Sequence, residues 1–218
     1  MKILTVIGAR PQFIKAAAFS KSLQKEKNIA EVIIHTGQHY DNNMSQVFFQ
    51  ELELSFPKYN LGIGNCSHGE MIGRQIIELE KIFLIENPDF VLLYGDTNST
   101  LSGAIIASKL NIPIIHVEAG LRSYNTKMPE EINRILTDHT SNILFAPTQT
   151  AENNLISEGV SKDKIHYVGD IMFDAKKIFS NRSRQPKDFN YSFKNNFYLL
   201  TIHRQENISD IKKLNIIF

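Results

Sequence analysis

Two acidic side chains of the sequence follow directly after short apolar runs, where a carboxylate can do proton chemistry. Asp96 comes one residue after the run 90–94, and Glu118 comes straight after the run 112–117. A carboxylate that donates or accepts a proton contributes about 10²–10⁴ in rate. Open α/β sheets place their active sites at the carboxyl ends of their strands. The spacing therefore predicts a reaction centre that contains Asp96 and Glu118.

A third carboxylate, Glu131, lies in the first turn of an expected helix, and the loop 120–127 returns it to the sheet edge. Three carboxylates near one pocket raise each other's pKa values, so we expect Asp96, Glu118 and Glu131 to form an acid–base set. Simpler roles stay open for each. Asp96 could cap the next helix, Glu118 could pair with Arg122, and the helix dipole alone favours an acid at Glu131.

The segment 8–15 joins the first apolar run to an expected helix and carries two cations, Arg10 and Lys15. Backbone N–H groups at a helix start favour an anion, and the two side chains add formal charge. We expect a phosphate or diphosphate here, although the segment matches neither common Gly-rich phosphate loop. The alternative is two solvated cations beside an ordinary turn.

Further polar side chains end two other expected strands. Gln38 and His39 follow the run 31–35, and His203 and Arg204 follow the run 196–202. His203 could protonate or hydrogen-bond a leaving phosphate, with Arg204 beside it. The alternative for His203 is a loop histidine with a structural hydrogen bond.

The order of these elements is strand, turn, helix, repeated, which predicts an α/β fold with a parallel sheet and flanking helices. Their apolar content, with little strict alternation, is typical of strands covered on both faces. We expect strands at 2–7, 31–35, 90–94, 112–117, 143–146, 165–168 and 196–202, and helices at 11–25, 67–85, 99–110, 129–140 and 148–158.

Composition narrows the function classes. A net charge of +1 over 218 residues gives no reason to expect a nucleic acid or a membrane as partner. The single cysteine excludes a disulfide framework and indicates a cytoplasmic protein. No clustered Cys or H-E-x-x-H pattern occurs, so we expect neither a metal nor a cofactor. We interpret His116 and His166, which lie within strands, as structural.

A polar, aperiodic stretch near the C-terminus indicates a linker. We expect an N-terminal domain at 1–180, a linker at 181–195 and the start of a second domain at 196–218. One strand and part of a helix cannot bury a core alone. The chain is therefore expected to be the front part of a longer protein, the alternative being that the tail packs on the first domain.

Five segments together resemble the non-hydrolysing UDP-N-acetylglucosamine 2-epimerases. They cover most of the chain in register and are GARPQFIK (8–15), YGDTNST (94–100), HVEAGLR (116–122), MPEEINR (128–134) and TIHRQEN (201–207). The resemblance implies a GT-B-like fold of two Rossmann-like domains with the substrate in the cleft between them, the second domain being incomplete here. It also implies a homodimer at full length.

The family chemistry implied is inversion at C2 of a UDP-linked amino sugar, through elimination and re-addition of UDP, for cell-surface polysaccharide precursors. By resemblance, Asp96, Glu118 and Glu131 form the acid–base group, with Arg10, Lys15 and His203 at the diphosphate. The segment 9–15 is also similar to that of the branch that acts on UDP-2,3-diacetamido-2,3-dideoxyglucuronate. A GT-B-like glycosyltransferase and an inactive truncated remnant remain the alternatives, and we expect the 218-residue chain alone to be weakly active or inactive.

Overall fold

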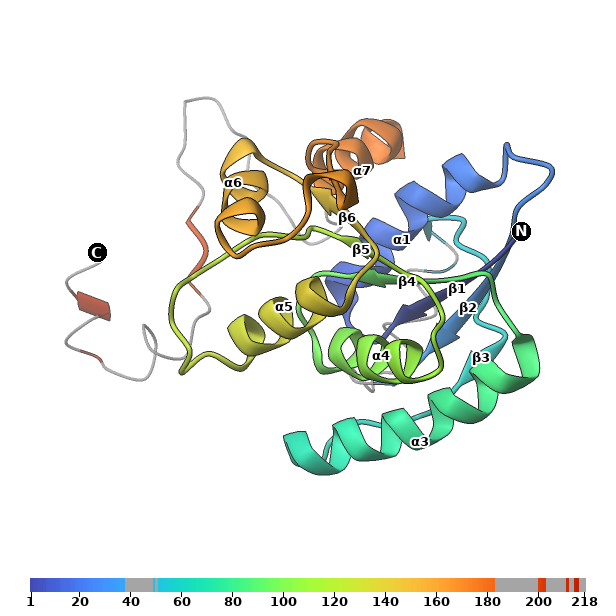
Figure 1. The fold of residues 1–218 in the computed structure, drawn as a ribbon. Coiled ribbons are helices and arrows are strands. Elements are labelled where there is room, and N and C mark those ends of the chain that lie inside the picture. The colour runs from blue at the N-terminus through green and yellow to red at the C-terminus, as the bar shows by residue number, and fades with distance from the viewer. Residues whose placement is uncertain (38–48, 50, 183–199, 203–210, 212–213, 216–218) are drawn as a thin grey trace. The chain divides into compact units, whose positions relative to one another are not determined.

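The computed structural model describes residues 1–37, 49, 51–182, 200–202, 211 and 214–215 (Figure 1). Contacts divide the chain into two units, Met1–Arg182 and Ser183–Phe218. The fold below is that of the first unit. The expected domain boundaries at 180 and 195 remain predictions.

Seven parallel strands form one sheet in the first unit. Its order is β3-β2-β1-β4-β5-β6-β7, and every neighbouring pair is parallel. The strands are β1 (Lys2–Ile7), β2 (Ala30–His35), β3 (Tyr59–Asn60), β4 (Phe90–Tyr94), β5 (Ile114–Val117), β6 (Ile143–Ala146) and β7 (Ile165–Tyr167). The α/β fold with a parallel sheet is confirmed.

Helices cover both faces of this sheet (Figure 1). One face carries α1 and α7, whose side chains pack in one apolar cluster, and the opposite face carries α3, α4, α5 and α6. The helices are α1 (Arg10–Leu23), α3 (His68–Glu86), α4 (Asn98–Lys109), α5 (Pro129–Thr140), α6 (Gln149–Ser157) and α7 (Ile171–Phe179). Two short 3₁₀ turns, Lys162–Lys164 and Ser180–Arg182, follow α6 and α7.

Alternate residues of each strand point to opposite faces of the sheet, as the pleat requires. In β4, Leu92 and Tyr94 join the cluster under α1, while Val91 and Leu93 join the cluster under α3 and α4. All four side chains are fully buried. Burial on both faces explains the near-continuous apolar runs of the sequence.

The expected elements within residues 1–182 match the structure within two residues, and side-chain caps account for several helix starts. Thr97 Oγ1 accepts the amide of Thr100 at the start of α4, and Thr148 Oγ1 accepts the amide of Ala151 at the start of α6. Among the described residues, the elements that were not predicted are the two-residue edge strand β3, helix α7 and the two 3₁₀ turns. Residues 200–202, the described part of the strand expected at 196–202, form no strand.

The connections between strands reverse direction at one place in the sheet. From β1 the chain moves to β2 and β3 on one side, and from β4 it moves to β5, β6 and β7 on the other. Ligands of open α/β sheets bind outside the carboxyl ends of the strands at such a switch point. Here that point lies between β1 and β4, next to the start of α1 with Arg10 and the turn that carries Asp96.

None of the helices that the structure describes combines the length and the apolar character needed to cross a lipid bilayer.

Candidate active site

The segments after β1, β4 and β5 meet at the switch point. Lys15, in the second turn of α1, forms an ion pair with Glu118, which follows β5 directly. The two side chains are only 12% and 14% exposed. Gly95 lies beside the pair, because a Cβ added to it would be 3.3 Å from Glu118 Oε2 and 3.4 Å from Lys15 Nζ. Three segments far apart in the sequence thus share one partly dehydrated site.

Glu118 is held in an unusual backbone conformation. Its φ is +68°, in the left-handed region that L-residues with a Cβ avoid. Such a conformation costs of order 1–3 kcal/mol and persists where the surrounding structure over-determines it, often at a functional site. The expected alternative for Glu118, an ion pair with Arg122, is wrong because Arg122 pairs with Asp138 and Glu158 instead.

Asp96 belongs to a second charged group, formed with helix α5. Its carboxylate pairs with Arg134, which also pairs with Glu131 through Nη2 at 2.7 Å. Asn133 of the same helix donates its side-chain amide to the Asp96 carbonyl at 2.8 Å. The alternative role of Asp96 as a helix cap is wrong, since Thr97 caps α4. Asp96 is about one-third exposed and so remains open to a ligand.

The carboxylate of Glu131 accepts hydrogen bonds from groups of the protein itself. Burial raises the pKa of its carboxyl group, but hydrogen bonds from the Ser123 and Tyr124 amides and from Arg134 outweigh burial and lower that pKa to about 2. The expectation that neighbouring carboxylates raise the pKa of Glu131 is therefore wrong. Glu131 is an anion that anchors the loop before α5 and holds Arg134 near Asp96.

The start of α1 differs from the expected anion site. The amides of Gly8 and Ala9 both donate to the side-chain oxygen of Gln12, at 2.8 and 3.0 Å, so they do not face a ligand. The Gln12 amide group then donates to the Tyr94 carbonyl at 2.8 Å, which ties the turn after β1 to the turn after β4. Arg10, the first residue of α1, is exposed at the rim.

Gly8 brings a further strand into this arrangement. A Cβ at Gly8 would overlap the hydroxyl oxygens of Thr36 and Ser99, which lie 2.7 Å from each other. The segments after β1, β2 and β4 therefore pack so closely that the two hydroxyl groups occupy the place of a Cβ at position 8, and glycine is the residue that fits there.

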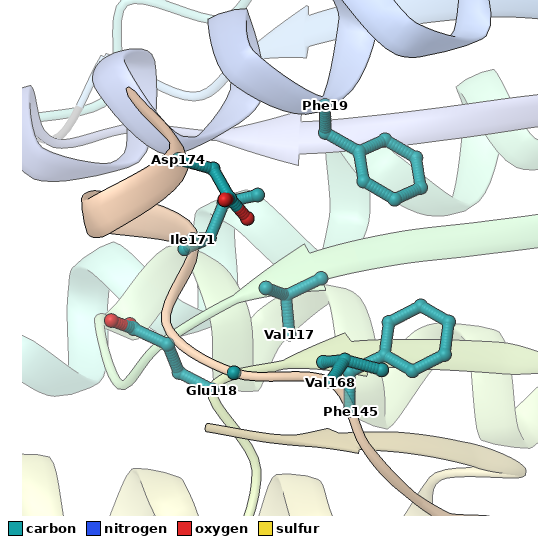
Figure 2. A pocket seen from close by; sticks show the side chains of 8 residues that line it. Phe19, Val117, Glu118, Phe145, Val168, Ile171 and Asp174 are labelled. Carbon is teal, nitrogen blue, oxygen red and sulfur yellow. The ribbon is translucent and has the colours of Figure 1, made fainter. Parts of the chain in front are cut away.

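An apolar cavity of about 250 Å³ opens beside Glu118. Figure 2 shows the rings of Phe19 and Phe145 at one side of this cavity and the Glu118 carboxyl group at the other, turned away from them. Asp174 of α7 also lines it. Among the described residues no group of three His, Cys, Asp or Glu side chains could hold a metal ion.

The structure thus brings Lys15 together with Glu118, and Asp96 together with Glu131. Gln38, His39, His203 and Arg204 lie outside the described residues, so their predicted roles stay predictions. Sequence reasoning missed Gln12, Asn133 and Arg134. The available signal was their place inside the two motifs that carry Arg10 and Glu131.

Comparison with known proteins gives a consistent result. Residues 21–218 match the family model described as UDP-N-acetylglucosamine 2-epimerase. The chain is 52% identical to the Pseudomonas aeruginosa UDP-2,3-diacetamido-2,3-dideoxy-D-glucuronate 2-epimerase, over 100% of this chain and 61% of the relative. The chain spans about 60% of the length of the curated relatives it matches.

Solved structures of this kind of enzyme are also similar to the chain. The crystal structure of the Methanocaldococcus jannaschii UDP-GlcNAc 2-epimerase in complex with UDP-GlcNAc and UDP matches with a TM-score of 0.89 and 48% identity, covering 100% of this chain and 60% of that one. A lipopolysaccharide outer core galactosyltransferase matches at 14% identity with a TM-score of 0.56, covering 78% of this chain and 46% of that one, which shows the fold alone. The expected Rossmann-like, GT-B-type arrangement of this sheet and its helices is confirmed.

Proposed function

The chain belongs to the UDP-N-acetylglucosamine 2-epimerase family, and from this premise we propose that it carries the acid–base side of an active site that inverts C2 of a UDP-linked 2-acetamido sugar. The single observation that carries the proposal is the partly buried Lys15–Glu118 pair at the switch point, with Asp96 on the adjoining turn. The relatives named above act on UDP-sugars of this class.

The reaction is an elimination followed by an addition. A base takes the C2 proton, the C2–H electrons form the C1=C2 bond, and the C1–O bond breaks with its electron pair leaving on UDP. A proton then returns to the other face of C2 while a UDP oxygen attacks C1. Carboxylates and cations are the side chains that this scheme needs, and both kinds line the site.

We assign the proton exchange at C2 to Glu118 and Asp96. Both carboxylates form ion pairs, Glu118 with an ammonium group and Asp96 with a guanidinium group. Each cation positions its carboxylate, and a bound substrate can displace that cation. Glu131 is the third member of the proposed group. Because it is an anion with all its partners inside the protein, we assign it the task of holding Arg134 against Asp96.

Lys15 and Arg10 are assigned to the departing diphosphate. A donor aimed at charge that develops in the transition state contributes about 3–4 kcal/mol. His203 remains the proposed partner of the leaving group, with Arg204, Gln38 and His39 as proposed substrate contacts. UDP-N-acetylglucosamine is the first substrate to test, and UDP-2,3-diacetamido-2,3-dideoxyglucuronate is the second, since the relative at 52% identity is named for it.

The experiment uses two proteins, the 218-residue chain and a fused protein. In the fused protein, this chain is joined to the part of the M. jannaschii relative that it does not cover. Each is incubated with either UDP-sugar in D₂O, and NMR follows deuterium at C2 and the inverted product. We expect exchange in the fused protein and little or none in the chain alone. A folded fused protein that exchanges neither sugar would contradict the proposal, and sugar transfer to an acceptor would favour a glycosyltransferase.

We also propose a homodimer as the state of the full-length enzyme. Helix α3 exposes three large apolar side chains, Ile77, Leu84 and Ile85, the last at 72%. Large apolar surface of this kind marks interaction sites. Light scattering of the fused protein and of its Ile85→Asp variant tests this, since the variant should then be a monomer.

The free, half-buried Cys66 supports a cytoplasmic location, which fractionation would test.

A further inference from the structure

Helix α5 carries a buried carboxylate that the reaction scheme does not use. Asp138 lies in the last turn of α5, and its side chain is fully buried. Burial raises the pKa of Asp138, but the charges and hydrogen bonds of His116 and Arg122 outweigh burial and lower it below the usual value. Asp138 is therefore ionised, and a buried anion of this kind needs partners.

Those partners come from the segment that contains Glu118. Asp138 Oδ2 accepts the backbone amide of Gly120 at 3.0 Å and the Arg122 guanidinium at 2.7 Å. Asp138 Oδ1 lies 2.6 Å from Nδ1 of His116, the residue two positions before Glu118. One carboxylate thus binds the His116 ring before Glu118 and the Gly120 backbone amide after it.

His116 extends this contact to the other catalytic turn. Its side chain is fully buried, and its Nε2 lies 2.8 Å from the carbonyl oxygen of Gly95, the residue before Asp96. An ionised carboxylate and a carbonyl can only accept hydrogen bonds, so both ring nitrogens must donate. This arrangement matches an imidazolium ring, and the two contacts give the fully buried His116 the structural role expected of it.

Each of the two turns held in this way contains a residue with a left-handed backbone, which is strained at Glu118. Gly95 has a φ of +63° and Glu118 a φ of +68°. Gly95 is fixed from both sides, because its amide donates to the Val117 carbonyl at 3.0 Å while its carbonyl accepts from His116. Strained residues persist only when their surroundings over-determine them.

We propose that Asp138 and His116 act as a pair of positioning residues, which fix the turns that carry Asp96 and Glu118 relative to each other. Neither residue touches the substrate in this proposal. The inference depends on the proposed function for its catalytic consequence, but the protonated ring and its two contacts are properties of the folded chain alone.

The first test is the state of the His116 ring at pH 7. In the chain labelled with ¹⁵N, we expect both ring nitrogens of His116 to show protonated shifts. Asp138→Asn keeps the shape and lets the side-chain NH₂ donate to Nδ1, so the ring should become neutral and the Asp96 amide signal should shift. A neutral ring in the unsubstituted chain would overturn the proposal whether or not any variant folds.

The second test is kinetic and uses the fused protein. Asp138→Asn should lower kcat about 10- to 100-fold, with KM changed less than about threefold, because the reacting groups are displaced while binding is retained. The matched control is Glu158→Gln, which also removes a carboxylate from Arg122 but does not contact either turn. The control should keep kcat within about twofold. Equal kcat values in the two variants would overturn the proposal, whereas no turnover in the unsubstituted fused protein would contradict only the proposed function.

Discussion

Because Glu118 has a left-handed backbone, we expect glycine to be more stable than alanine at this position, the reverse of the usual order. At an ordinary position, alanine is more stable than glycine by about 0.4–1 kcal/mol, because glycine leaves the unfolded chain freer. At φ +68° an alanine Cβ costs roughly 1–2 kcal/mol, which glycine avoids. We therefore expect Glu118→Gly to be more stable than Glu118→Ala by about 0.5–1 kcal/mol.

Both variants lose the Lys15 ion pair equally, so their difference reports the backbone alone. The assay is urea unfolding at pH 7, with one m-value shared by the two variants. In thermal unfolding, each kcal/mol of difference shifts Tm by about 2–4 °C for a chain of this size. The matched control is Glu80, an exposed residue in the middle of α3, where Gly should be less stable than Ala by about 1 kcal/mol. Equal stability of the two variants at 118, or greater stability of Ala, would refute the assignment of strain to Glu118.

Three further predictions concern other charged or crowded positions. Burial raises the pKa of Glu31 despite its hydrogen bond from Thr5. The charged carboxylate therefore destabilises the folded state once the pH exceeds about 4.5, and Glu31→Gln should raise the free energy of unfolding at pH 7. The Lys58 ammonium, with the Tyr59 hydroxyl, lowers the pKa of Glu86 to about 2, so Glu86→Gln should destabilise by about 1–2 kcal/mol at pH 7 and by less as the pH falls from 4.5 towards 2. Gly8→Ala should destabilise by about 1–3 kcal/mol in urea unfolding, because its Cβ overlaps two hydroxyl groups.

Each of these three has an outcome that would contradict it. For Glu31, the stabilisation should vanish below pH 4, and a constant gain at all pH values would point to packing instead of charge. For Glu86, an equal loss at pH 3 and pH 7 would contradict the ionic origin. For Gly8, an alanine variant as stable as the unsubstituted chain would contradict the overlap. The matched control is Gly73→Ala on α3, where an added Cβ meets nothing within 4 Å and should stabilise.

Much of the sheet could be predicted from the sequence, because strands covered on both faces leave long apolar runs. The runs at 2–7, 90–94 and 143–146 coincide with β1, β4 and β6 to the residue. The edge strand β3 has only two residues and no such run, so its pairing with β2 depends on tertiary contact. Helix α7 was missed because it has only nine residues and exposes Met172 and Phe173, so its apolar residues do not all mark a buried face.

The part of the candidate site that depends on which residues follow which strands could be predicted from the sequence. Asp96 and Glu118 end neighbouring strands, and strand order alone brings them to one edge. Their partners were not predictable, because Arg134 reaches Asp96 across 38 residues and Lys15 reaches Glu118 across 103. The low pKa of Glu131 was missed for a similar reason, since backbone amides that fold onto a carboxylate leave no mark in the sequence.

The most direct test of the account is C2 deuterium uptake by the fused protein and its Glu118→Gln variant, each with UDP-N-acetylglucosamine in D₂O. Glutamine keeps the size and a hydrogen-bonding oxygen but cannot take a proton at neutral pH. We expect the variant to unfold at a similar temperature and to bind UDP, yet to exchange the C2 proton at least about 10²-fold more slowly. Exchange at an undiminished rate would contradict the claim that Glu118, held by Lys15 at the switch point, moves the C2 proton.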